Sequence, residues 1–148
     1  MELDNFKNLI WDYTRKIAEG SNCAFSPLGE KHGLTMMQVR ILMGLKEYDY
    51  HTVGSLSDCI GVAGANISAM CKKLEAVGLI ERIRNQEDER VVKIVLTKQG
   101  QGIVLDINNT LNERISKCFE NETEETLQTI ITGLQLLNNL LQKMCETE

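Results

Sequence analysis

The sequence has little of the residues that build disulfide frameworks and metal sites. It contains two histidines and five cysteines, and the cysteines form no CxxC or CxxH pair. This pattern argues against a disulfide scaffold and against zinc, so we expect reduced thiols, no metal and no cofactor. The single proline, Pro27, falls in the segment with the least regular pattern.

Membrane and export signals are also missing. No apolar run approaches about 18 residues, the shortest that reads as a membrane span. The first residues, MELDNFKNLI, lack a basic segment followed by an apolar one, which is the pattern of a secretory signal. We therefore expect a cytoplasmic protein that does not bind membranes.

Catalytic signatures are absent as well. The sequence contains no GxSxG, no HExxH and no glycine-rich phosphate loop, which mark common hydrolase and nucleotide sites. Gly61, Gly64, Gly78 and Gly100 fall at expected helix ends, where glycine has a structural role. We expect no enzymatic activity.

The charge is distributed unevenly along the chain. The net charge over 148 residues is −5, which on its own argues against nucleic acid as a partner. Residues 63–96, however, hold six basic and five acidic side chains, and the remainder is net −6. Because attraction to phosphate depends on local charge, an acidic remainder is compatible with a DNA-binding segment.

Apolar spacing and capping residues predict the helices of the first half. A first helix is expected from about Leu3 to Ala18, followed by an irregular segment over residues 20–34. Thr35 and Gln38 form a capping-box pattern that begins a second helix. Thr52 begins a short third helix that closes at Gly61, and a fourth is expected from Gly64 to Val77. Two helices joined by a tight turn form a helix-turn-helix, in which the second helix reads DNA.

Residues 78–100 predict the wing of a winged helix. Leu79, Ile80 and Ile83 form one apolar run, and Val92, Ile94 and Leu96 alternate at period two. Such runs favour two strands, and the polar residues 85–90 between them are typical of a turn. The tip of a wing can place an arginine into the DNA minor groove.

The terminal helices carry wide apolar faces. Thr97 is expected to cap one long helix and Thr123 another, both rich in leucine and isoleucine. A winged helix cannot cover these faces alone, so we expect a homodimer that reads an inverted repeat in double-stranded DNA. The expected fold is mainly α (α+β). Residues 1–148 form one chain in this scheme, with a winged helix-turn-helix over 35–97 and dimerisation helices over 1–20 and 98–146.

Three motifs resemble the MarR family of bacterial winged-helix regulators. They are G-L-I-x-R at 78–82, N-x-x-D-x-R at 85–90 and IVLTKQG at 94–100. The resemblance spans nearly the whole chain, and it implies that Arg90 enters the minor groove and that Asp88 orients it. The chain departs from the family pattern at Gln86, where proline is common, and at Glu89, where a second arginine is common.

The recognition helix and its surroundings supply the other DNA-contact candidates. Asn66 and Ser68 can read base edges, and Ala65 can approach the groove closely or contact a thymine methyl group. Phosphate contacts are expected from basic side chains around this helix. The candidates are Arg40, Lys72, Lys73 and Arg84. The alternative for each is an ordinary solvated surface residue, and for Arg90 a salt bridge to Asp88.

The resemblance also implies two ways to control binding. The family commonly binds aromatic acids, and Trp11, Tyr13 and Arg15 could line such a pocket; the alternative, which the residues alone favour, is core aromatics and a surface charge. Some relatives sense peroxide through an N-terminal cysteine, which makes Cys23 the redox candidate. We interpret the chain as a sequence-specific DNA-binding transcriptional regulator, a dimeric repressor released by a small-molecule effector or by thiol oxidation. The alternative is a winged-helix module for protein–protein interaction without specific DNA binding.

Overall fold

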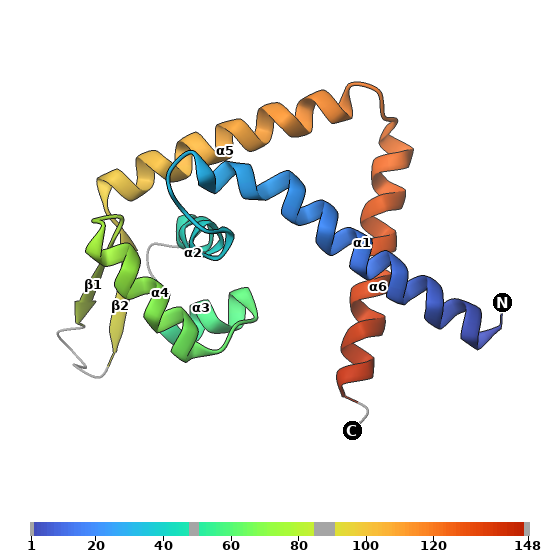
Figure 1. Cartoon of the computed structure of the whole chain (residues 1–148), viewed down its shortest axis with the longest axis horizontal. Helices are drawn as coiled ribbons and strands as arrows, with labels where there is room; N and C mark the ends of the chain where they lie inside the picture. The colour runs from blue at the N-terminus through green and yellow to red at the C-terminus, as the bar shows by residue number, and fades with distance from the viewer. Residues whose placement is uncertain (1, 48–50, 85–90, 147–148) are drawn as a thin grey trace. The chain divides into compact units, whose positions relative to one another are not determined.

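The protein, seen in a computed structural model, is mainly helical with one small antiparallel sheet, as the sequence predicted (Figure 1). The structure describes residues 2–47, 51–84 and 91–146. Residues Met1–Thr110 form one compact unit and Leu111–Glu148 form a second. Among the described helices, none combines the length and apolar character needed to cross a lipid bilayer. In chain order the elements are α1 (Leu3–Glu30), α2 (Met36–Lys46), α3 (Val53–Ile60), α4 (Gly64–Ala76), β1 (Ile80–Arg84), β2 (Val92–Leu96), α5 (Lys98–Phe119) and α6 (Glu124–Cys145).

The first helix is longer than its sequence pattern predicted. α1 continues past Gly20 to Glu30 and includes Pro27. The expected end at Ala18 and the irregular segment over residues 20–30 are therefore wrong. The chain turns only after Glu30, where Gly33 has a φ of 66°.

Packing of its last turns explains this extension. Phe25 and Leu28 continue the three- and four-residue spacing of the helix, and Leu28 is buried. A Cβ atom at Gly29 would lie 2.5 Å from the Leu34 carbonyl oxygen and 2.8 Å from Val39 Cγ2, so the end of α1 is pressed against the start of α2. Burial of this end outweighs the weak helix propensity of glycine and proline.

Threonine caps begin α2 and α3, as predicted. The Gln38 N–H donates to Thr35 Oγ1 at 3.3 Å, and the Thr35 N–H donates to Gln38 Oε1 at 2.9 Å. Thr52 and Ser55 form the same reciprocal pair at α3. α3 ends at Gly61 with a φ of 71°, a left-handed conformation that glycine adopts without strain. The expected helix–turn–helix arrangement of α3 and α4 is therefore confirmed.

The two strands form the base of the wing. β1 and β2 pair antiparallel, with Ile80 opposite Leu96 and Arg84 opposite Val92. His51 extends the ladder, since its N–H donates to the Ile94 carbonyl at 3.0 Å and its carbonyl accepts from the Ile94 N–H at 2.6 Å. The predicted minor-groove residues Asp88 and Arg90, and the departure at Glu89, lie outside the described residues.

One hydrophobic core holds the winged helix together. Side chains from α2, α3, α4, both strands and the first half of α5 meet in it with almost no solvent exposure, which stabilises their mutual positions. These residues are Ile41, Leu42, Leu56, Ile67, Leu74, Ile80, Ile94 and Ile107.

The second unit leaves its apolar side chains uncovered. α6 begins at the cap of Thr123, whose Oγ1 accepts from the Thr126 N–H at 3.1 Å. No residue of α6 is buried. Large apolar side chains on this helix are about half-exposed or more, and they are Ile130, Ile131, Leu134, Leu136 and Met144. α1 in the first unit has a similar exposed stripe of Phe6, Leu9, Tyr13 and Ile17.

Candidate nucleic-acid interface

α4 has one buried stripe and one open face. Ile67, Cys71 and Leu74 are fully buried at a spacing of four and three residues, which fixes the rotation of the helix in the core. The face turned to solvent carries the base-reading and phosphate candidates. Of these, Ala65, Asn66, Lys72 and Lys73 are exposed and Ser68 is half-buried.

The N-terminus of α4 is open as well. The residue before it, Ala63, offers no side-chain hydrogen bond to the first turn. Helix N-termini carry free N–H groups and partial positive charge, which favour phosphate and other anions. The small side chains of Ala63, Gly64 and Ala65 therefore leave this positive end accessible to a nucleic-acid backbone.

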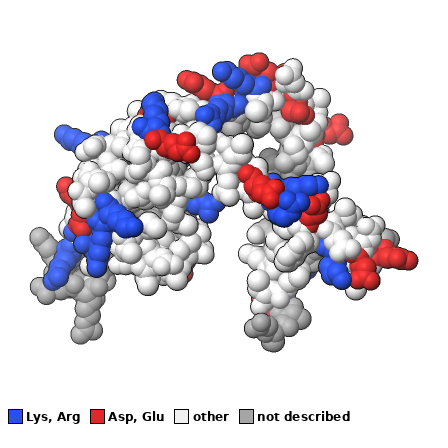
Figure 2. Space-filling model, in the orientation of Figure 1, with Lys and Arg blue, Asp and Glu red and all other residues white. Residues whose placement is uncertain are grey.

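Basic side chains cluster around this helix. Figure 2 shows Lys and Arg gathered over the part of the surface formed by α4 and the strands, with fewer acidic groups among them. Lys72, Lys73 and Arg84 are exposed there, and Arg40 is exposed on α2. The local positive charge expected from the sequence is thus presented at the surface, although the whole chain is acidic.

Arg82 has a role that sequence reasoning missed. Its Nε donates to Glu75 Oε2 at 2.7 Å, and its Nη2 lies 2.5 Å from the same oxygen. The Arg82 N–H also donates to Glu75 Oε1 at 3.3 Å. The guanidinium lowers the pKa of the Glu75 carboxyl below its ordinary value through these hydrogen bonds. The two residues lie on either side of the turn at Gly78, in different elements, so neither helical nor strand periodicity reveals the pair.

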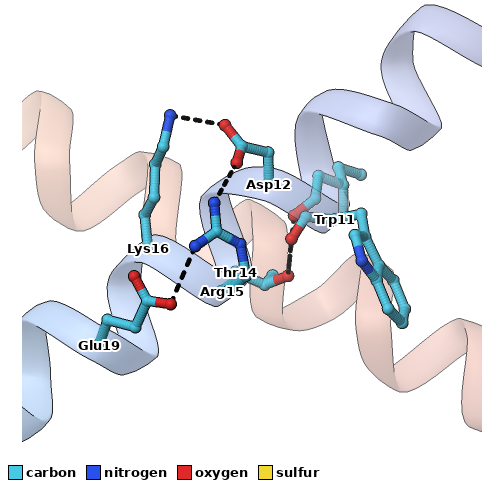
Figure 3. A network of polar contacts seen from close by, with 7 residues as sticks. Trp11, Asp12, Thr14, Arg15, Lys16 and Glu19 are labelled. Atoms are coloured by element: carbon cyan, nitrogen blue, oxygen red, sulfur yellow. Dashed lines mark hydrogen bonds and ion pairs between the residues drawn. The ribbon is translucent and has the colours of Figure 1, made fainter.

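The predicted effector residues lie on the exposed part of α1. The Arg15 guanidinium pairs with Asp12 at 2.8 Å and with Glu19 at 2.9 Å, while the indole of Trp11 points away from this network (Figure 3). The Tyr13 ring lies 5.3 Å from Lys16 Nζ. A ligand carboxylate would therefore compete with two acidic side chains for Arg15. An effector site at these residues stays a prediction.

A hollow of about 430 Å³ lies elsewhere, between the end of α2, β2 and the first half of α5. Its apolar walls include Leu45, Leu96 and Val104, and Gln101 supplies a polar group. This volume is within the range of small-molecule pockets. Sequence spacing could not identify it, because its lining comes from three separate segments.

The cysteines differ in accessibility. Cys71 is buried in the core, and burial raises the pKa of its thiol, so it behaves as a small core residue. Cys59 is exposed on α3. Cys23 is exposed on α1 rather than in a loop.

Two basic residues that follow Cys23 in the sequence, Lys31 and His32, contact a carboxylate on α5 instead. Lys31 Nζ lies 2.9 Å and His32 Nε2 lies 2.8 Å from Asp106 Oδ2. These contacts tie the end of α1 to α5, and they lower the pKa of the Asp106 carboxyl. The proximity of Lys31 and His32 in the sequence therefore does not by itself indicate an activated Cys23 thiol.

The chain is similar in sequence to known bacterial regulators. A family model described as transcriptional regulator SarA/Rot matches residues 24–107. The HTH-type transcriptional regulator SarZ of Staphylococcus epidermidis is 28% identical over 108 residues, which cover 72% of this chain and 70% of SarZ. The organic hydroperoxide resistance transcriptional regulator of Bacillus subtilis is 36% identical over 76 residues, 51% of this chain and 52% of that protein.

Solved structures show the same fold. The crystal structure of a MarR family transcription regulator aligns with a TM-score of 0.87 and 21% identity, over 98% of this chain and 95% of that one. FabT of Streptococcus pneumoniae, solved in complex with DNA, aligns with a TM-score of 0.79 and 20% identity, over 94% of this chain and 99% of FabT. The predicted winged-helix fold is thereby confirmed.

Proposed function

Since the chain belongs to the SarA/Rot family of transcriptional regulators, which share the winged helix of MarR-type proteins, we propose that it represses transcription as a homodimer on an inverted DNA repeat. The chain is a DNA-binding transcriptional regulator. The observation that carries the proposal is the solvent-facing side of α4, with Asn66, Lys72 and Lys73 exposed beside the wing. FabT, which has the same fold, was solved bound to DNA. In this proposal α4 enters the major groove and the wing follows the adjacent minor groove.

A second copy of the chain is the proposed cover for the terminal helices. Large apolar side chains are exposed repeatedly along α1 and α6, and soluble monomers rarely expose extended apolar patches. A symmetric pair would bury them and would set two α4 helices about one turn of DNA apart. Within the single MarR-like chain of residues 1–148, we assign DNA binding to residues 35–97 and dimerisation to residues 1–20 and 98–146.

The test of this function is selection of bound sequences from a random duplex pool, followed by affinity measurements against salt. An enriched inverted repeat with a steep salt dependence is the expected result. Failure to enrich any sequence in the reduced, ligand-free state would favour the alternative of a protein–protein interaction module. The net charge of −5 and the glutamate at position 89 are the features that favour that alternative.

Removing the wing arginine should weaken DNA binding. Arg90→Ala is expected to lower affinity for the selected duplex about tenfold, because a minor-groove arginine contributes both charge and shape recognition. The slope of log affinity against log salt concentration should become shallower by about one unit, as it does when one basic contact to the DNA backbone is lost. Fluorescence anisotropy at several salt concentrations measures both quantities. Lys31→Ala, which removes an exposed positive charge outside residues 35–97 and outside the proposed dimerisation helices, is the control. Equal binding by Arg90→Ala and wild type would refute the wing contact.

Thiol oxidation is one proposed release mechanism. The relative from Bacillus subtilis is named for organic hydroperoxide resistance, and Cys23 is exposed, so an oxidant can reach it. Peroxide is expected to release wild-type protein from DNA, and Cys23→Ser is expected to stay bound. Cys118→Ser, which replaces another exposed thiol, should remain as sensitive as wild type. If Cys23→Ser is released as readily as wild type, Cys23 is not the sensor.

A small-molecule effector is the other proposed release mechanism. The sequence-based candidates are Trp11, Tyr13 and Arg15, and the hollow between α2, β2 and α5 is a second location. A ligand in this hollow would contact the wing strand and α5 together, so its binding can change the wing position. An aromatic acid that weakens DNA binding would support this mode, and loss of its effect in Arg15→Gln or in Gln101→Ala would identify the location.

A further inference from the structure

We propose that Glu75 and Arg82 are positioning residues that hold the wing at a fixed angle to α4, so that both elements meet DNA as one rigid body. The inference rests on the proposed joint use of α4 and the wing on DNA. Neither residue is needed in this proposal as a DNA contact itself. The pair would act by fixing where Asn66 on α4 and Arg84 on the wing stand relative to each other.

The contacts of the pair cross from the recognition helix to the first wing strand. Both oxygens of Glu75 are used, one by the Arg82 backbone N–H and the other by its guanidinium. The Glu75 backbone carbonyl also accepts from the Gly78 N–H at 2.9 Å, which closes the end of the helix. Glu75 therefore links the helix end, the turn and the strand through one residue.

The strand residue opposite Arg82 is also held by contacts to the rest of the winged helix. Arg82 is paired in register with Ile94, and Ile94 exchanges two backbone hydrogen bonds with His51. The His51 ring is in turn 3.0 Å from Ser55 Oγ, in the first turn of α3. One row of contacts thus runs from α4 through the wing base to α3. Such a row constrains the wing against both helices of the helix-turn-helix.

An electrostatic role and a positioning role of Glu75 predict opposite changes in DNA affinity when its charge is removed. The side chains of Glu75 and Arg82 are only 35% and 31% exposed, and Glu75 is a negative charge next to the proposed phosphate-binding surface. If only charge mattered, neutralising it would strengthen DNA binding. If the residue positions the wing, neutralising it would weaken binding, since the wing and α4 would no longer match their grooves together. The sign of the effect therefore separates the two roles.

The test compares Glu75→Gln with Glu81→Gln. Both remove one negative charge near the wing base, but Glu81 is exposed and lies on the opposite face of β1 from Arg82. Glu75→Gln is expected to weaken binding about threefold to tenfold, while Glu81→Gln binds like wild type or slightly tighter. Amide hydrogen exchange in β1 and β2 of the free protein should be faster in Glu75→Gln only. Binding by Glu75→Gln that equals or exceeds that of wild type overturns the proposal.

Replacement of the partner tests whether Arg82 touches DNA. Arg82→Gln is expected to weaken binding with an unchanged salt slope, whereas loss of a phosphate contact would lower the slope by about 0.9. A lowered slope overturns the positioning role. If Arg82→Gln does not fold, Arg82→Lys keeps the charge but loses the forked geometry, and it should weaken binding to a similar degree. Sequence-specific binding by the wild-type protein tests the proposed function separately. Hydrogen exchange in β1 and β2 tests the restraint on the wing without DNA, so the two proposals can fail independently.

Discussion

Leu134→Glu is expected to abolish dimerisation at micromolar protein concentration and, with it, specific DNA binding. Leu134 is 50% exposed on α6, in the middle of the apolar stripe that we propose is covered by a second copy. Burial of an unpaired carboxylate costs several kcal/mol, and a two-fold interface contains the change twice. The dimer dissociation constant should therefore rise at least about a hundredfold. Sedimentation velocity measures the dimer, and anisotropy on the selected inverted repeat measures the DNA complex.

Thr132→Glu is the control for this change. It places the same charge on the same exposed helix, two residues earlier and therefore on the opposite side. Glutamate has good helix propensity, so neither variant should lose helical content. Thr132→Glu should dimerise and bind DNA like wild type. A dimeric Leu134→Glu with normal DNA affinity would show that the α6 stripe is not the interface.

The elements with strong local signals could be predicted from the sequence. The caps at Thr35 and Thr52 depend on side chains three residues apart, so the sequence itself contains both partners. The pairing of β1 with β2 follows from two short apolar runs around a polar turn. The open face of α4 also follows from periodicity, because the buried positions of a helix determine which positions remain outside.

Features that depend on packing between elements could not be predicted in this way. The extension of α1 beyond Gly20 depends on burial of Leu28 and on the close approach of Gly29 to α2. Local rules assign a helix end there, since glycine and proline are weak helix formers. The exposed position of Cys59 depends on how α3 is rotated in the core.

The candidate site shows the same division. Exposure of Asn66, Lys72 and Lys73 was predictable from the helical pattern. The ion pair of Glu75 with Arg82 was not, since many acidic and basic residues occur between 63 and 96 and no spacing rule selects these two. The sequence shows which side chains are charged, but the folding of the chain around the Gly78 turn determines which of them form an ion pair.

Gly100→Ala is expected to destabilise the first unit by about 2–3 kcal/mol, as overpacking of a closed core site does. Gly100 is buried in the first turn of α5, and a Cβ atom there would lie 2.0 Å from the Leu79 carbonyl oxygen and 3.3 Å from Leu96 Cδ2. Relief would require α5 to move away from the start of the wing. The Gly100 N–H also donates to Thr97 Oγ1 at 3.0 Å, so such a movement would disturb the cap. Thermal and urea unfolding measure the loss.

Gly102→Ala separates close packing from a general effect of glycine in α5. Gly102 lies two residues further along the same helix, is exposed, and has no atom within 4 Å of an added Cβ. Alanine there should leave stability unchanged or raise it by up to about 1 kcal/mol, because it improves helix propensity. Stability changes of opposite sign at the two positions would show that α5 packs closely against the wing because Gly100 has no side chain. Equal effects at both positions would mean that the close approach of Gly100 to Leu79 relaxes at little cost, and that the wing is held to α5 by other contacts.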